Sequence, residues 1–125
     1  MQKVCVTGIF DTDIDQFHLV MDDSDRNFGC KPATANARCV GIVVKDVEGA
    51  SGSATIAESV QTSGEQFVKL ASGETVVVGD PLKCVGSAEA GKAAVATDNV
   101  FGFSRENATG PRLITCVLSH LANYQ

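Results

Sequence analysis

The sequence has 125 residues, of which 44% are apolar and 20% charged, a composition that predicts one soluble globular domain. Its net charge of −5 argues against nucleic acid as a direct partner, because an acidic surface repels phosphate. We expect no membrane partner, since no apolar run is long enough to span a bilayer, and synthesis in a cytoplasm, since the N-terminus lacks the pattern of a signal peptide.

The first predicted element is an apolar segment, Met1–Phe10, whose residues alternate in character over Lys3–Thr7. Such alternation is typical of a β-strand with two different faces. Two interpretations stay open: the segment is the first strand of the domain's own sheet, or an arm that adds an edge strand to another protein. Its apolar side chains are the candidate contacts with another protein, namely Val4, Val6, Ile9 and Phe10.

An acidic stretch follows, and its spacing resembles a calcium-binding loop. Asp11, Asp13, Asp15 and Asp22 occupy positions one, three, five and twelve of such a loop. Position six requires glycine for a sharp turn, but Gln16 stands there, and position twelve lacks the usual glutamate. The four aspartates are therefore a weak metal candidate, and a solvated acidic loop is the alternative.

The remaining chain reads as short strands separated by turn residues, without the periodicity of an amphipathic helix. The sequence therefore predicts an all-β fold, a small β-barrel or β-sandwich with little or no helix. After Lys3–Thr7 the predicted strands are Gln16–Met21, Cys39–Lys45, Ala54–Val60, Gln66–Leu70, Thr75–Val78, Leu82–Val85, Lys92–Ala96, Val100–Ser104 and Leu113–Ser119.

One predicted corner interrupts these strands at Gly-Asp-Pro. Gly79 is free to adopt unusual backbone angles, Asp80 tends to cap a turn with its side chain, and Pro81 cannot continue a central ladder. The sequence offers Asp80 no catalytic partner, so we interpret the stretch as a structural turn.

The chain also contains a possible internal repeat. When residues 31–59 are aligned with residues 92–119, Lys31 meets Lys92 and Gly41 meets Gly102. Each glycine lies inside an apolar strand, where glycine often marks a bulge or a close approach of two backbones. We therefore expect two similar halves, with Gly41 and Gly102 as matching bends.

The cysteines and histidines form no recognisable catalytic or metal-binding motif. None of the five cysteines belongs to a Cys-x-x-Cys pair, and the two histidines, His18 and His120, lie in unremarkable contexts. Four cysteines follow the pattern of small buried hydrophobic residues in strands. We expect a single domain over residues 1–125 that is not an enzyme and holds no cofactor.

The order of glycine and apolar steps is similar to that of the capsid cement, or head decoration, proteins of tailed phages. The landmarks are Gly41, the loop from Gly49 to Gly52, the Gly79–Leu82 step, Gly102 and the closing strand from Thr115 to Leu118. The pattern covers nearly the whole chain, but it contains no catalytic signature.

This resemblance implies a β-rich protein on the outer face of a phage head, synthesised in the host cytoplasm and commonly trimeric. The expected partners are the major capsid protein and further copies of the chain, and the expected action is to bridge capsid subunits and stabilise the head. An N-terminal arm would then pair with the capsid protein or with a neighbouring protomer. The alternatives are another virion component, such as a tail or fibre part, or a small β-barrel that binds a ligand.

Overall fold

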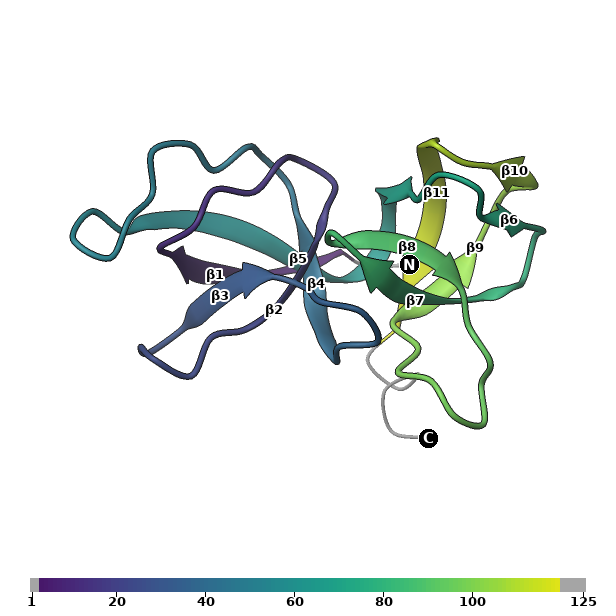
Figure 1. The fold of residues 1–125 in the computed structure, drawn as a ribbon, viewed down its shortest axis with the longest axis horizontal. Coiled ribbons are helices and arrows are strands. Elements are labelled where there is room, and N and C mark those ends of the chain that lie inside the picture. The colour runs from purple at the N-terminus through teal and green to yellow at the C-terminus, as the bar shows by residue number, and fades with distance from the viewer. Residues whose placement is uncertain (1–2, 120–125) are drawn as a thin grey trace.

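The computed structural model describes residues 3–119, and this part of the chain contains strands and loops but no helix (Figure 1). The strands are β1 (Val4–Phe10), β2 (Leu19–Asp22), β3 (Gly29–Pro32), β4 (Cys39–Val43), β5 (Ile56–Leu70), β6 (Thr75–Val76), β7 (Pro81–Gly86), β8 (Glu89–Lys92), β9 (Gly102–Ser104), β10 (Ala108–Thr109) and β11 (Arg112–Leu118). No helix that could span a membrane is found among the described residues.

Nine of these strands close into two rings that share β5, the longest strand. The first ring runs β1-β3-β2-β4-β5 and closes through the pairing of β1 with β5. The second runs β5-β11-β9-β7-β8 and closes through the pairing of β5 with β8. Figure 1 shows the two rings as two lobes joined along β5. The prediction of a small all-β barrel fold is confirmed.

The two rings are repeats of one another, which confirms the two predicted halves. β3 runs parallel to β1, with Ile9 opposite Gly29, and β8 runs parallel to β5, with Leu70 opposite Ala90. Each residue of the second pair follows its counterpart by the same 61 positions that separate Lys31 from Lys92. The antiparallel pair Met21–Lys31 between β2 and β3 likewise corresponds to Leu82–Lys92 between β7 and β8.

The matching glycines lie where two strands approach too closely for a side chain. A Cβ atom on Gly41 would collide with the carbonyl oxygen of Gln61, and one on Gly102 would collide with that of Val117. Gln61 belongs to β5, which pairs with β4, and Val117 belongs to β11, which pairs with β9, so the two contacts are equivalent. The predicted bends therefore coincide with backbone contacts that only glycine permits.

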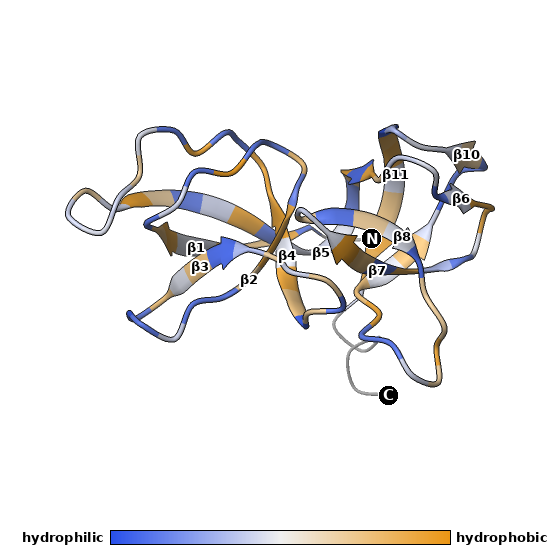
Figure 2. Ribbon diagram, viewed as in Figure 1, coloured by the Kyte–Doolittle hydropathy of each residue, from blue (hydrophilic) through white to orange (hydrophobic). Residues whose placement is uncertain are grey.

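Each ring encloses an apolar core, and the cores meet between the rings. The larger core fills the second ring but also includes Leu19 of β2 and Ile42 of β4. The smaller core fills the first ring but also includes Ala88, from the turn between β7 and β8. Ala88 accepts a hydrogen bond from the Leu19 N–H (2.8 Å) and donates one to the Ala33 carbonyl (3.1 Å). These contacts hold the two rings against each other. Figure 2 shows hydrophobic residues along the strands of both lobes.

The Gly-Asp-Pro stretch forms the predicted corner. Gly79 has a φ of 91°, and the Asp80 carboxylate accepts a hydrogen bond from the Val77 N–H at 2.9 Å. Pro81 then begins β7 and pairs with Phe103 of β9.

Three details of the predicted strand pattern are wrong. The strand predicted at Lys92–Ala96 lies earlier, as β8, because a tight turn at Ser87 and Ala88 returns the chain against β7 from Glu89 onward, and residues 93–96 lie outside any strand. The residues Thr62–Gly64 were expected to form a turn between two strands, but they lie inside β5. This continuous strand pairs with β1 up to Ser63 and with β11 from Gly64 onward, so ladders on both sides of the expected turn keep it extended. The strands β3 and β10, which were not expected, are short and lie in polar sequence.

Both described ends of the chain lie beside the middle of β5. β1 begins opposite Ser63 and β11 ends opposite Gly64. Lys3 accordingly lines surface hollows together with Thr115 and Val117 of β11.

Candidate binding surface

The N-terminal segment is a strand of the first ring, and its first half lies on the molecular surface. β1 pairs with β5 from Val4 to Phe10, so this segment belongs to the domain's own sheet. The residues from Val4 to Thr7 are nevertheless exposed on both faces of the strand, with 45% of Val4 and 44% of Val6 accessible to solvent. Only the second half of β1 enters the core, through Phe10.

The first half of β1 also has an open edge. β3 pairs with the other side of β1 only at Ile9 and Phe10. Successive residues of an antiparallel strand direct their backbone groups to opposite sides. Because the Ile9 N–H donates to the Phe28 carbonyl on the β3 side (2.8 Å), the backbone groups of Cys5 and Thr7 face that same side. Within residues 3–119 no strand pairs with them there.

An exposed aromatic residue stands at the end of this open edge. Phe28 lies just before β3, at the end of the hairpin that joins β2 to β3, and 80% of its surface is accessible. Its φ of 59° is in the left-handed region, which costs a bulky residue about 1–3 kcal/mol. The corresponding hairpin of the second ring instead buries Ala88 in the first ring. Phe28 is therefore a strained aromatic residue with no core to fill.

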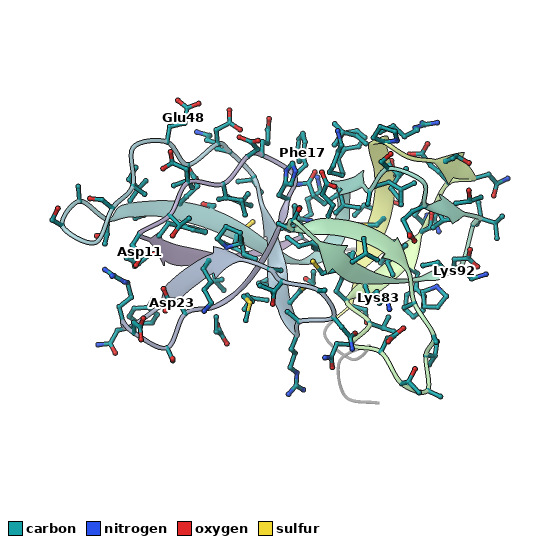
Figure 3. The ribbon with its side chains drawn as sticks, in the orientation of Figure 1. Asp11, Phe17, Asp23, Glu48, Lys83 and Lys92 are labelled. Carbon is teal, nitrogen blue, oxygen red and sulfur yellow. The ribbon has the colours of Figure 1, made fainter. Side chains whose placement is uncertain are left out.

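Phe28 and β1 together form an apolar hollow, and the hairpin next to it is acidic. The hollow has a volume of about 320 Å³ and is lined by Val6, Thr7, Ile9 and Phe28. The neighbouring hairpin carries Asp22, Asp23 and Asp25 against one cation, Arg26, which Asp11 already binds at 3.0 Å. Figure 3 shows Asp11 and Asp23 at this end of the first ring, whereas the labelled lysines lie on the second ring.

Of the four predicted contact residues, three lie at this surface. Val4 and Val6 are exposed and Ile9 is half-buried. Phe10, in contrast, is completely buried in the first core and is unavailable to a partner. Sequence reasoning missed Phe28, because the stretch just before it, Met21–Arg26, is typical of a charged turn.

The four aspartates of the calcium-like pattern do not converge on one point. Asp11 binds Arg26, and the Asp13 carboxylate accepts a hydrogen bond from the Ala50 N–H at 2.8 Å. Asp22 lies at the end of β2, where it pairs with Cys30. In the part of the chain that the structure describes, no group of three or more His, Cys, Asp or Glu side chains is placed to hold a metal ion.

Four of the five thiols are buried and poorly reactive. Burial raises the pKa of Cys39 and of Cys116 to about 12 and that of Cys30 to about 11, and it also raises the pKa of Cys84. A raised pKa suppresses the thiolate, which is the nucleophilic form. Cys5 is the exposed one.

Of the two histidines, the structure describes His18. Its Nε2 lies 3.6 Å from Oε2 of Glu89, and its Nδ1 lies 3.1 Å from the Gln16 carbonyl oxygen. His120 is outside the described residues.

A second apolar surface covers the outer face of the second ring. Phe67 of β5, Leu113 of β11 and Phe103 of β9 are 48%, 42% and 38% exposed. Phe67 and Leu113 lie on neighbouring paired strands, and β9 continues the same sheet through Val117. Phe17 packs against Phe67 edge to face, with ring centroids 5.5 Å apart.

The fold is similar along nearly its whole length to a solved structure described as head fiber gp8.5 N base of bacteriophage phi29. The two share 22% sequence identity and a TM-score of 0.71, over 94% of this chain and 95% of that chain. No family model matches the sequence, and no curated protein matches it. At this level of identity the similarity establishes the fold alone.

Proposed function

We propose that this chain is a structural protein of a phage virion that binds the outer face of the head and stabilises it. The observation that carries the proposal is the similarity of fold, over almost the entire chain, to the base of a phage head fiber. The glycine and apolar landmarks that resemble cement proteins point to the same part of a virion, and the repeat accounts for two of them, Gly41 and Gly102. Capsid protein is thus the proposed partner.

The action would be binding without chemistry. A bridging protein needs more than one contact surface, and the exposed apolar residues of β1 and of the β5-β11-β9 face provide two. Interfaces of this kind typically bury about 1,200–2,000 Å². Repetition around a closed shell converts moderate contacts into high avidity, and self-association into a trimer would multiply them further.

A second candidate, the base of a head fibre, is favoured by the printed description of the similar structure. Both candidates bind the head, but only a cement protein must strengthen it. The two candidates are therefore distinguished by measuring the heat resistance of the shell with and without bound protein.

Co-sedimentation with purified heads that lack this protein tests the proposal. We expect saturable binding to expanded heads, no binding to free capsid subunits, and a higher temperature of DNA release from the decorated particles. Binding without any gain in heat resistance would favour the fibre base. Absence of binding to the heads of the phage that encodes the chain would refute both candidates.

A further inference from the structure

We propose that the open edge of β1 receives an extended strand of the head's subunit protein, whose apolar side chain fills the hollow beside Phe28. This inference rests on the proposed function, because it names the segment by which the head would be recognised. Three observations carry it: unpaired backbone groups, an apolar hollow beside them and the acidic hairpin that carries Phe28.

The first observation is the backbone of Cys5 and Thr7. Their N–H and C=O groups face a side on which the described chain supplies no strand. Proteins usually protect such an edge with proline, a bulge or charged side chains. Here the edge between Cys5 and Gly8 keeps a regular register against β5, and Val6 is exposed on it. An edge in this state is suited to strand addition.

The second observation is the hollow, which fixes where the added strand ends. β3 lies beside β1 only from Ile9 onward, so a strand added at Thr7 would lie in line with β3 and stop at Phe28. The lining by Val6, Ile9 and Phe28 accepts an apolar side chain from that strand. In the second ring the equivalent hairpin already makes a docking contact, through Ala88, so the hairpin that carries Phe28 belongs to a type that docks elsewhere in the same fold.

The third observation is charge. The hairpin next to Phe28 carries the exposed Asp22 and Asp25 and the buried Asp23, and the Asp11 carboxylate already engages its single arginine. A partner strand is therefore expected to carry Lys or Arg at the end that meets the hairpin. Such attraction between exposed groups weakens as salt is added.

The decisive variant is Thr7→Pro, compared with Ser72→Pro. Proline removes the outward N–H of Thr7 but spares the ladder to β5, because the flanking residues, Val6 and Gly8, make those bonds. Ser72 lies on the second ring, in the turn closed by the Glu74 N–H and the Ala71 carbonyl, where proline is well tolerated next to Gly73 at a φ of 82°. Both variants are measured for binding to heads that lack the protein.

We expect Thr7→Pro to bind the heads about tenfold more weakly or worse, since it removes a hydrogen bond and blocks the edge. Ser72→Pro should bind as the unmodified chain does. Asp25→Lys should weaken binding at low salt and reduce its dependence on salt. If Thr7→Pro binds as well as Ser72→Pro, the edge is not the site, although the proposed function stands. If the unmodified chain does not bind, both proposals fall.

Hydrogen exchange of the unmodified chain provides a second measurement that does not depend on the folding of a variant. The Thr7 amide should exchange about tenfold more slowly on the head than in the free protein, because it becomes paired. The Ser72 amide should be unchanged. An equally fast Thr7 amide in both states would overturn the inference.

Discussion

At the scale of single residues, Gly41 and Gly102 show how backbone contacts determine sequence. At each position a Cβ atom would collide with a carbonyl oxygen of the neighbouring paired strand, and a backbone carbonyl cannot rotate away as a side chain can. The repeat is visible in the sequence partly because no other residue fits at these positions. Phe28 is the opposite case, since its backbone has a left-handed φ of 59° while 80% of its surface remains exposed to solvent.

We predict that Gly41→Ala and Gly102→Ala each lower the free energy of unfolding by about 3 kcal/mol, as overpacking against a rigid backbone does. Gly52→Ala is the matched control, because a Cβ atom there meets nothing within 4 Å. Urea denaturation measures all three. Equal stability of Gly41→Ala and Gly52→Ala would show that the two strands separate easily at this point.

The buried thiols predict a loss of stability at high pH. In the folded chain the pKa of Cys39 and Cys116 is about 12, whereas an unfolded thiol ionises near its ordinary value of about 9. Above pH 9 the unfolded chain therefore releases protons that the folded chain retains. The stabilisation is complete below pH 9 and declines as the pH rises toward 12.

Urea denaturation between about pH 8 and about pH 10.5 tests this decline. The free energy of unfolding should fall less steeply with rising pH for Cys116→Ala, which lacks one such thiol, than for the unmodified chain. Cys5→Ala is the control, because it removes an exposed thiol in place of a buried one. Identical slopes for all three proteins would contradict the assignment of the decline to buried thiols.

At the scale of elements, β1 is a strand of the domain's own sheet, which was one of the two interpretations that the sequence left open. It pairs with β5 over seven residues and buries Phe10, yet its first half offers an open edge to solvent. Alternation of apolar residues identifies a strand, but it does not tell which of its edges is covered. That depends on where β3 lies, and β3 covers β1 only at Ile9 and Phe10.

We predict that removal of residues 1–10 unfolds the domain, because it opens the first ring and exposes the space that Phe10 fills. An arm would be removable without this effect. The control Val6→Ser changes an exposed residue of the same strand and should alter the free energy of unfolding by about 0.5 kcal/mol or less. Thermal unfolding followed by circular dichroism measures both. A truncated chain that melts cooperatively near the temperature of the intact chain would contradict the structural role of β1.

How much of the fold and of the surface could be predicted depends on whether a feature is local in the sequence or set by partner strands. Short runs rich in Val, Ile and Thr and the turn at Asp80 are local features, and both were read from sequence. The continuity of β5 through Thr62–Gly64 was not, because two partner strands override the local turn composition. The exposure of Phe28 was equally hidden, since sequence gives no sign that Ala88, and not Phe28, docks against the neighbouring ring.

At the scale of the whole molecule, two five-stranded rings share one long strand and hold each other through Leu19, Ala33 and Ala88. This arrangement is compact, leaves apolar residues exposed on both rings and has the fold of a phage head fiber base. The acidic excess is concentrated in residues 3–63, which carry nine acidic and five basic side chains, against six and five in residues 64–119. A basic surface on the head would therefore favour contact through the first ring.

Electron microscopy of heads incubated with the purified protein tests the central claim most directly. We predict added density on the outer surface of the shell, into which the two-ring fold fits with β1 and Phe28 of the first ring against a capsid subunit. Heads that remain bare at saturating protein concentration would contradict the account.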